Sequence, residues 1–385
     1  MYDHSDVSIV GGGPVGSALA LALAQFSPQL RVQVLEARMN ISHSAGQRTL
    51  ALSYGSRLIL DRLGVWQGLC NVTPIRHIHI SQRGSVGLAQ LHASEERVPE
   101  LGYVVDYAEL DVALHRALAD STVKVITGAH VSASGSTAQY AWIKLAQDGK
   151  QRLLTTCLAA IADGGGGQSK RETRDYDQHA LLAWVGCTAP QANWAFERFT
   201  AQGPAALLPH GEGYALVWTD LPERVEQLLS MQDTEFLSAL QCHIGDRVGR
   251  FNAVYGRSSY PLTQSRVQEA VQAHRVMIGN AAHVMHPVAG QGFNLGLRDA
   301  WELALHIHDS NNAELGSLPM LQQFAAQRKL DVSASMWFTD RLVRVFTHAH
   351  PLLQHVRGAG LMALQQLPPL KHFIARRMMF GARAW

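Results

Sequence analysis

The chain has 385 residues, which is enough for two or three domains or for one large domain with insertions. Hydrophobic residues make up 47% and charged residues 17%, so the chain can bury a sizeable core and is not mainly disordered. Its 33 Lys and Arg against 31 Asp and Glu are too balanced for a dedicated nucleic-acid binder. Residues 341–385 hold seven basic and no acidic residues, which leaves 26 basic against 31 acidic residues before them. The sequence is therefore a mildly acidic body with a basic C-terminal tail.

Hydropathy and cysteine usage constrain the cellular compartment. No apolar run approaches the roughly 18–20 residues that span a bilayer, and no basic segment precedes an apolar stretch at the N-terminus. Cys70, Cys157, Cys187 and Cys242 are far apart and form no C-x-x-C pair. This spacing fits a reducing compartment better than a disulfide framework or a zinc ribbon, so we expect a cytoplasmic protein.

The first elements along the chain form a βαβ pattern. Residues 6–10 predict a strand, the alanine- and leucine-rich residues 17–26 predict a helix, and residues 31–35 predict a second strand. A glycine-rich turn separates the first strand from the helix, and Glu36 closes the second strand. The unit has about the 30-residue length of a dinucleotide-binding βαβ unit.

The rest of the chain alternates between helical and strand-like patterns. Helices are predicted over residues 50–63, 106–118 and 294–308, and strands over 75–80, 123–126, 141–145, 158–162 and 276–278. Between residues 180 and 261, alternating runs such as 205–208 and 214–218 predict an antiparallel sheet. We therefore expect two interleaved units, an α/β nucleotide-binding unit and a mostly antiparallel unit inserted into it.

The glycine turn matches the dinucleotide fingerprint G-x-G-x-x-G. Gly11 permits the tight turn, Gly13 lets the backbone approach a pyrophosphate, and Gly16 lets the helix pack closely on the sheet. The N–H groups and the positive end of the helix dipole then face the phosphates. Glu36 can accept hydrogen bonds from a ribose diol, which favours FAD or NAD over NADP at this turn. The turn alone leaves FAD and NAD open.

A second glycine-bearing segment, residues 279–296, decides for a flavin. A strand runs into a loop rich in glycine and proline and then into a helix, whose N-terminal N–H groups can receive negative charge. A reduced flavin carries negative charge at its pyrimidine end, so this helix terminus would stabilise it. Gly290 and Gly292 allow the backbone to lie against a flat ring system.

At this point the sequence resembles the group A flavoprotein aromatic monooxygenases, the para-hydroxybenzoate hydroxylase-like family. An N-terminal G-x-G-x-x-G, a central Asp-Gly and a late Gly-Asp…Pro…Gly-x-Gly loop occur in this order in that family. Further segments look like its ubiquinone-biosynthesis branch, most of all the hydroxylases of 2-polyprenyl-6-methoxyphenol. These segments are residues 47–53, 62–66, 196–200, 203–204, 207–209 and 286–296.

The resemblance implies site residues one by one. The ADP half of FAD would be held by Gly11, Gly13, Gly16 and Glu36. Arg48 would contact the phosphate or ribityl region, Asn280 would bond the ribityl chain, and the matching cofactor motifs also contain Asp163 and Gly279. The isoalloxazine would be lined by Pro287, Gly290, Gly292 and Asn294. Pro287 would lie nearest the oxygen-reactive carbon and is the residue predicted to be catalytic.

Two positions depart from the family pattern. Asn280 stands where the family usually has Asp, which keeps hydrogen bonding but removes a charge. Asp163 and Gly164 continue into further glycines, so that Ser169 and Arg171 are displaced from the family's positions. For Asp163, a role as a cap of its own loop stays open beside the cofactor role.

The resemblance also implies a fold, a reaction and partners. The fold would be a Rossmann-like, glutathione-reductase-type FAD-binding domain with an interleaved α+β substrate domain and a C-terminal helical tail. The FAD-binding domain would comprise residues 1–74, 102–174 and 272–345, the substrate domain residues 75–101 and 175–271, and the tail residues 346–385. NAD(P)H, FAD and O₂ would convert a 2-polyprenyl-6-methoxyphenol to the 1,4-benzoquinol by way of a flavin hydroperoxide. Other ubiquinone-biosynthesis proteins would be possible partners, and nucleic acid would not.

The basic tail has two interpretations. Leu367, Leu370, Phe373, Ile374 and Met378 fall at near-helical spacing, which is typical of an amphipathic helix on an anionic bilayer. We expect membrane-surface contact through this tail, and a packed terminal helix with a solvated basic face is the alternative. Two further alternatives stay open for the whole protein: a related flavoprotein with another aromatic or prenyl substrate, and a flavin-bearing subunit without turnover.

No metal is expected at the two histidines of the second segment. His283 and His286 lie three residues apart, but no third Asp, Glu or Cys joins them locally.

Overall fold

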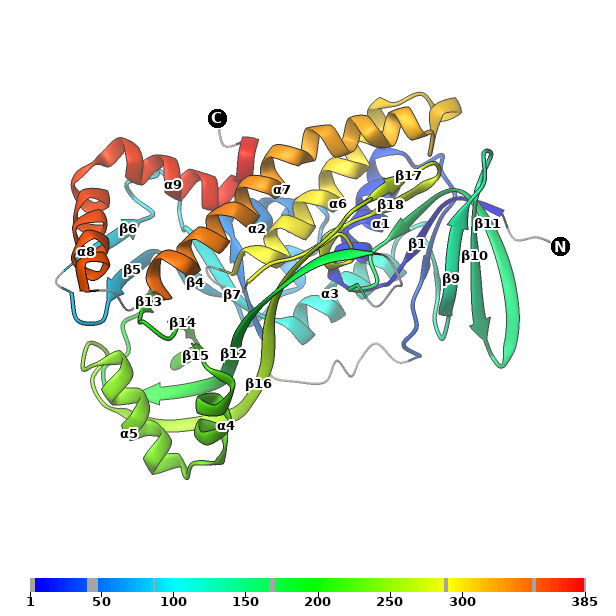
Figure 1. Ribbon diagram of the computed structural model, residues 1–385. Helices are drawn as coiled ribbons and strands as arrows, with labels where there is room; N and C mark the ends of the chain where they lie inside the picture. The colour runs from blue at the N-terminus through cyan, green and yellow to red at the C-terminus, as the bar shows by residue number, and fades with distance from the viewer. Residues whose placement is uncertain are drawn as a thin grey trace.

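The computed structural model describes residues 4–39, 48–85, 87–165, 170–286, 290–347 and 351–383. Two large sheets lie side by side, joined by two long strands, and helices cover the upper side (Figure 1). The predicted combination of an α/β unit, an antiparallel second unit and a helical C-terminal region is confirmed.

The first sheet carries the predicted βαβ unit. Its strands are β17 (Val271–Gln272), β18 (Arg275–Met277), β11 (Lys150–Ile161), β1 (His4–Val10), β2 (Val32–Leu35) and β8 (Lys124–Ile126), in this spatial order. The hairpin strands β9 (His130–Ser136) and β10 (Ala141–Gln147) extend from β11. β1 lies parallel between β2 and β11, which brings the carboxyl ends of these strands to one edge of the sheet.

Three helices pack together beside this sheet: α1 (Pro14–Phe26), α3 (Tyr107–Ala119) and α6 (Gln291–Asp309). Helix α1 is apolar on nearly every side, and its alanines and leucines from residue 18 to residue 23 are all buried. Small side chains let α1 approach β1, α3 and α6 at once, so a helix without a polar face is stable in this position.

The second sheet is largely antiparallel. Its order is β19 (His283–Val284), β16 (Phe251–Val267), β12 (Arg171–Cys187), β15 (Gly213–Asp220), β14 (Pro204–His210), β13 (Trp194–Phe199), β5 (His77–Gln82) and β6 (Leu88–His92). β12 and β16 have 17 residues each and run from the first sheet to the far end of the second (Figure 1). The predicted domain boundaries stay a prediction.

Two helices were missing from the prediction for residues 180–261. α4 (Pro222–Ser230) and α5 (Asp233–Ile244) pack Leu228, Phe236 and Leu240 against the second sheet. Their burial supplies the hydrophobic face that short helices need, because isolated helices of this length are marginal in water.

The predicted helix over residues 50–63 is wrong in its first turn. Residues 49–53 form β3 (Thr49–Ser53), which pairs with β7 (Gly102–Asp106), and β7 in turn pairs with β4 (Thr73–Ile75). Helix α2 (Tyr54–Arg62) begins only after Ser53, whose side-chain oxygen accepts a hydrogen bond from the Ser56 N–H at 3.2 Å. Strand pairing across fifty residues overrides the local helical spacing here.

The C-terminal helices are α7 (Leu318–Thr347), α8 (Pro351–Gln366) and α9 (Pro368–Phe380). α9 buries Lys371, Ala375 and Met379 against the body, and the Lys371 ammonium lies 2.7 Å from a Glu95 carboxylate oxygen. Lys371 is therefore buried, and Glu95 compensates its charge. Within the described residues, no helix combines the length and the hydropathy that crossing a membrane requires.

Candidate active site

The glycine turn between β1 and α1 has the geometry that a pyrophosphate needs. Gly11 has a φ of +100°, and a Cβ there would lie 2.6 Å from the Ala162 carbonyl oxygen. A Cβ on Gly16 would lie 2.0 Å from the Gly11 carbonyl oxygen. At Gly13, by contrast, no described atom of the chain lies within 4 Å of the place that a Cβ would take, so the space beside it is open. Gly11 and Gly16 therefore serve the packing of the turn, and Gly13 faces the space left for a ligand.

Glu36 closes β2 at the bottom of the same turn. Its carboxylate accepts hydrogen bonds from the Gly12 N–H at 2.9 Å and from the Arg38 N–H at 2.8 Å, and the Arg38 guanidinium contacts both of its oxygens. Burial alone would raise the pKa of Glu36, but Arg38 and Gly12 outweigh it, so the pKa lies below its ordinary value. The carboxylate is thus ionised and fixed, ready to accept hydroxyl groups on the side that faces the cavity.

Arg38 was missed by the sequence analysis. Its guanidinium also lies 2.6 Å from a carboxylate oxygen of Asp111 on α3, which is fully buried. The hydrogen bond to Glu36 and the charge of Asp111 raise the pKa of Arg38, so it stays charged. An arginine two residues after the acidic residue was the only signal in the sequence, and its partner Asp111 is 73 residues away.

The second glycine-bearing segment approaches the same space from another side. Gly279 has a φ of +57° and begins η2 (Gly279–Ala281), where its N–H donates to the Asp299 carboxylate at 3.1 Å. Gly290 has a φ of +60° and caps the N-terminus of α6. A Cβ on Gly292 would meet no described atom within 4 Å, so this position, like Gly13, is open toward the cavity. Pro287 lies outside the described residues, and its predicted role stays a prediction.

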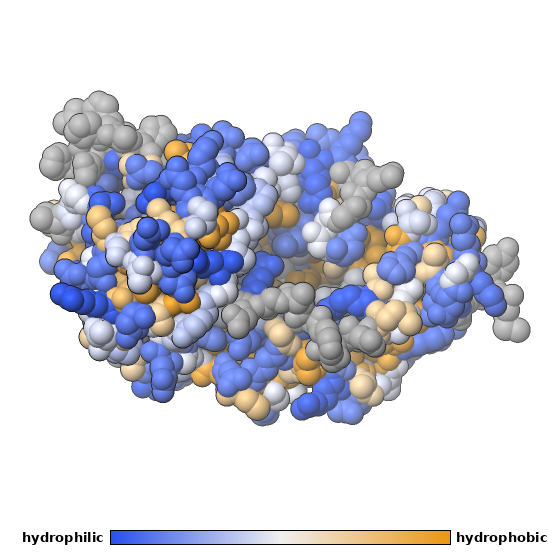
Figure 2. Space-filling view, turned by 90° about the horizontal axis from the view of Figure 1, so that it is seen from below, coloured by the Kyte–Doolittle hydropathy of each residue, from blue (hydrophilic) through white to orange (hydrophobic). Residues whose placement is uncertain are grey.

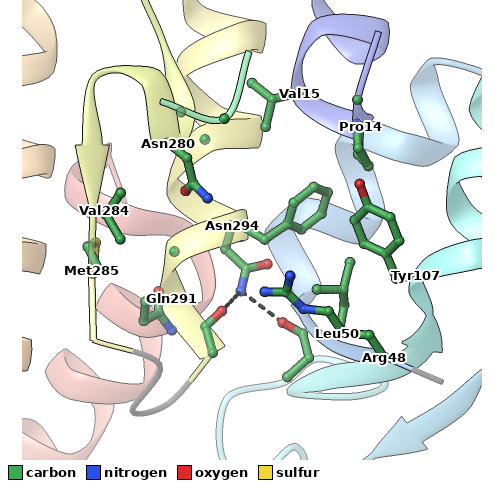
Figure 3. A pocket seen from close by; sticks show the side chains of 18 of the residues that line it. Pro14, Val15, Arg48, Leu50, Tyr107, Asn280, Val284, Met285, Gln291 and Asn294 are labelled. Atoms are coloured by element: carbon green, nitrogen blue, oxygen red, sulfur yellow. Dashed lines mark hydrogen bonds between the residues drawn. The ribbon is translucent and has the colours of Figure 1, made fainter. Parts of the chain in front are cut away.

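Asn294 holds this segment to β3. Its side-chain oxygen accepts from the Ser53 N–H at 2.9 Å and the Ser56 hydroxyl at 2.7 Å, and its nitrogen donates to the Ala51 and Gly290 carbonyls. Figure 3 shows the two bonds to the carbonyl groups beneath the cavity. All four hydrogen-bonding positions of the amide are used within the chain. Asn294 therefore borders the cavity as a clamp that positions the loop and the start of α6.

Arg48 projects into the cavity beside Asn294 and Leu50 (Figure 3). Its guanidinium carbon lies 6.0 Å from the ring centre of Tyr107 and 5.9 Å from that of Tyr260. Burial raises the pKa of both tyrosines, which keeps both hydroxyls protonated. The two rings fix Arg48 as a cation between the two sheets, where it can meet an anionic part of a ligand. Neither tyrosine was singled out from the sequence.

Asp163 follows β11 and is exposed at the cavity edge. One of its carboxylate oxygens accepts from the Gly165 N–H at 2.9 Å, as a residue that caps its own loop does. Arg171, at the start of β12, donates to the carbonyls of Asn280 and Ala281 at 3.3 and 2.5 Å. The side chain of Asn280 points toward the cavity (Figure 3). Asp163, Arg171 and Asn280 all line the same cavity.

A buried ionic network supports the second segment from behind. His283 lies 2.7 Å from Asp299, which also pairs with Arg328 at 2.9 Å; Arg328 pairs with Asp331 at 2.9 Å. The Ala382 N–H donates to Asp331, which ties the end of the chain to the same network. Burial would raise the pKa of Asp299, but His283 and Arg328 bring it well below its ordinary value. The Nε2 atom of His283 is therefore committed to a carboxylate, not presented as a metal ligand.

All these elements surround one cavity of about 1110 Å³, larger than the roughly 300–1,000 Å³ of typical small-molecule sites. Seen from below, the surface is hollowed between the two parts of the molecule, and hydrophobic side chains line part of the hollow (Figure 2). Gly13 and Glu36 line the cavity from the first sheet and its turn, Gly292 lines it from the start of α6, and the second sheet and α9 line the rest. The open spaces at both glycines and the two helix N-termini fit a dinucleotide that carries a flat ring.

This arrangement defines a flavoprotein with room for a second, apolar ligand beside the cofactor. A family model described as "FAD binding domain" matches residues 4–328, so the chain belongs to this family, and it is an FAD-dependent monooxygenase.

Two relatives are 30% identical to the chain. Ubiquinone hydroxylase UbiL of Rhodospirillum rubrum matches over 97% of this chain and 89% of its own length. The 3-demethoxyubiquinol 3-hydroxylase of Escherichia coli matches over 95% of this chain and 96% of its own length. The crystal structure of p-nitrophenol 4-monooxygenase PnpA from Pseudomonas putida has a TM-score of 0.81 with all of both chains covered. At 16% identity, this last likeness concerns the fold alone.

Proposed function

We propose that the protein hydroxylates the ring of a polyprenylated phenol in ubiquinone biosynthesis, converting a 2-polyprenyl-6-methoxyphenol to the 1,4-benzoquinol. The observation that carries the proposal is the single cavity that joins the dinucleotide turn to an apolar chamber. The full-length similarity to a ubiquinone hydroxylase and to a 3-demethoxyubiquinol 3-hydroxylase supports the pathway. The ring position follows from the resemblance of motifs such as residues 196–200 and from the para-directing effect of a phenol.

The residues around the cavity indicate which roles the cofactor would have in the reaction and which the protein would have. Bound FAD, once reduced by NAD(P)H, supplies an electrophilic oxygen atom that comes from O₂. Gly13 and Glu36 would hold its ADP half, Asn280 would bond its ribityl chain, and Gly292 would border its ring. Arg48 would meet its phosphate or ribityl region. One NAD(P)H and one O₂ are consumed for each hydroxyl group added, and the second oxygen atom leaves as water.

The apolar chamber suits a prenyl tail. Ile78 on β5 and Leu91 on β6 line it from the sheet, and Met378 and Met379 line it from α9. Such a lining excludes water from the ring of the substrate, and this favours oxygen transfer over loss of the oxidant to solvent. Methionine side chains adapt to irregular apolar ligands, which suits a flexible isoprenoid.

The outer face of the C-terminal helices would approach the membrane in which the prenyl tail resides. Leu367, Leu370 and Phe373 are 51%, 43% and 48% exposed, beside the part of α9 that lines the cavity. Arg376 is exposed on the same helix and would face anionic headgroups. We propose that the protein is cytoplasmic and contacts the inner face of the cytoplasmic membrane through these helices.

The proposed reaction is tested with the purified flavoprotein and 2-geranyl-6-methoxyphenol. We expect NAD(P)H-dependent O₂ uptake and a product heavier by one oxygen atom, read by mass spectrometry. Cells that lack the protein should accumulate the 2-polyprenyl-6-methoxyphenol. Accumulation of a later, demethoxylated precursor would move the reaction to another ring position. Absence of substrate-dependent O₂ uptake would leave the protein as a flavin-bearing subunit without turnover.

A further inference from the structure

The first sheet brings a histidine, a carboxylate and a cysteine together where β1 begins. β1 and β11 run parallel beside each other, and His4 pairs with Thr155 (Figure 1). The same offset of 151 residues aligns Asp6 with Cys157. Side chains two residues apart on a strand point to one face of the sheet, so all four side chains share a face. The ligand-type atoms of His4, Asp6 and Cys157 lie within 4.8 Å of one another.

The histidine and the cysteine are spaced like two ligands of one tetrahedral zinc ion. The Nε2 atom of His4 lies 3.7 Å from the Sγ atom of Cys157. Zn–N and Zn–S bonds of about 2.0 and 2.3 Å that meet at a tetrahedral angle hold the two ligand atoms roughly 3.5 Å apart. The Nδ1 atom of His4 lies 3.1 Å from the Thr155 hydroxyl. A hydrogen bond from Nδ1–H to that hydroxyl leaves the lone pair on Nε2, beside the sulfur.

Asp6 supplies the third ligand atom, and Arg31 holds its carboxylate in place. The carboxylate accepts from the Arg31 backbone N–H at 2.8 Å and from the guanidinium at 3.0 and 3.1 Å. A carboxylate has about four acceptor positions, so one position remains for a cation. Carboxylates that bind metals are themselves oriented by such outer hydrogen bonds. Asp6 offsets the charge of Arg31, and a Cys157 thiolate would make the group net negative, which attracts a divalent cation.

This group is open to solvent and separate from the cofactor cavity. His4 is exposed, and Asp6 and Cys157 are partly exposed, so an ion can reach them. None of the three lines the cavity. β1 has 7 residues between the start of the strand and the glycine turn, which places the group roughly 20 Å from that turn. The flavin site therefore does not account for these three side chains.

We propose that His4, Asp6 and Cys157 bind a zinc ion and that Thr155 orients His4 for it. A set of one imidazole nitrogen, one thiolate sulfur and one carboxylate oxygen suits Zn²⁺, whereas Mg²⁺ and Ca²⁺ prefer oxygen ligands alone. A water molecule completes the tetrahedron. When the S–Zn bond forms, the Cys157 S–H bond breaks and its proton goes to the solvent. The ion then ties the start of β1 to β11, and this role does not depend on the proposed function.

Four substitutions test the members of the site one at a time. Cys157→Ser, His4→Gln and Asp6→Asn each remove or weaken one ligand, and Thr155→Val removes the hydroxyl beside Nδ1. Cys242→Ser is the matched control, because Cys242 is another free cysteine, exposed on α5. Each protein is prepared untagged, with its FAD, and is freed of metal with a chelator. The FAD content should be the same in every variant, because the site lies away from the cavity, and it shows that the variants are folded.

The first measurement is calorimetric titration with Zn²⁺ alone. We expect a single Zn²⁺ per chain with a dissociation constant of about 1 µM or lower. Cys157→Ser and His4→Gln should weaken binding by about 100-fold or more, and Asp6→Asn and Thr155→Val by about 10-fold, because loss of an outer contact alone costs about 10- to 100-fold. The control should bind like the unmodified protein.

The second measurement uses Co²⁺ as a spectroscopic substitute for Zn²⁺. Tetrahedral Co²⁺ with a thiolate ligand gives d–d bands at longer wavelengths than the flavin absorbs, and Cys157→Ser should lose them. Failure of the unmodified protein to bind Zn²⁺ stoichiometrically overturns the proposal. Affinity that is unchanged in Cys157→Ser or His4→Gln, or that falls equally in Cys242→Ser, also overturns it. Unchanged affinity in Asp6→Asn or Thr155→Val refutes the role of that residue.

Discussion

The two ends of the cavity are built by different means. Where the dinucleotide would bind, the ligand space is shaped by backbone: missing Cβ atoms at Gly13 and Gly292 and the starts of α1 and α6. At the sheet end, it is shaped by side chains from the strands of the second sheet and from α9. A site shaped by the backbone loses its ligand when a single added side chain fills the space. A wall of many apolar side chains loses only a small part of its binding free energy with each substitution. The cofactor should therefore depend on single residues, and the apolar ligand on many.

Gly13→Val tests this comparison most directly and should have the largest effect. Gly13 has φ −68° and ψ 176°, which valine tolerates, and no described atom lies within 4 Å of the new Cβ, so the fold should persist. The side chain would occupy the place of the pyrophosphate and weaken FAD binding by about 100-fold or more, roughly 2.7 kcal/mol. The measurement is the FAD content of the purified protein. Gly360→Val, at an exposed glycine with similarly open surroundings, is the control. Full FAD retention in Gly13→Val would contradict the placement.

Asp299→Asn tests how far the second glycine-bearing segment depends on the buried ionic network packed behind it. Removal of the carboxylate leaves His283 and Arg328 buried without their shared partner, and we expect a loss of about 3–5 kcal/mol in unfolding free energy. Because the native pKa of Asp299 is lowered, its contribution is present above about pH 4 and is lost as the pH falls through the native pKa. Denaturant unfolding between pH 3 and pH 7 should therefore show a flatter acid dependence in the variant. Equal pH slopes in both proteins would exclude this role.

Asn294→Ala removes the clamp between α6 and β3. The Ser53 N–H and the Gly290 carbonyl lose their partner, which should cost about 2–4 kcal/mol of unfolding free energy and loosen the loop beside the ring. Urea unfolding measures the first effect, and the FAD dissociation constant measures the second. Asn71→Ala, at an exposed position, should change neither. If FAD affinity is unchanged in Asn294→Ala, the clamp does not position the flavin loop.

Phe373→Ser tests the proposed membrane contact of α9, where several side chains share the contact and a single substitution should have a small effect. Phe373 is 48% exposed on α9, so its loss from a membrane contact should cost about 1 kcal/mol, which is roughly a fivefold weaker association. Co-sedimentation with vesicles that contain anionic lipid is the measurement. Leu221→Ser, at a position 49% exposed before α4, is the matched control. Equal losses in both variants would argue for non-specific adhesion instead of contact through α9.

Local patterns predicted the dinucleotide end well, because its elements follow one another along the chain. β1, the glycine turn, α1, β2 and Glu36 lie within the first 36 residues, and each is specified by its own neighbours. The same local logic failed at residues 50–53, where a distant strand takes the backbone, and it did not show α4 and α5. The pairing of β3 with β7 depends on residues fifty positions away, which a window of neighbouring residues does not contain.

The sequence by itself determined the class of cofactor, the βαβ unit and the presence of a second glycine-bearing segment. Only the tertiary structure showed that Arg38 joins Glu36 to Asp111 and that Asn294 uses all its hydrogen-bonding positions within the chain. It also showed that the second sheet lines the cavity. The reason is physical. A backbone turn is encoded by the residues that form it, whereas a wall assembled from many strands exists only once the sheet has paired in register.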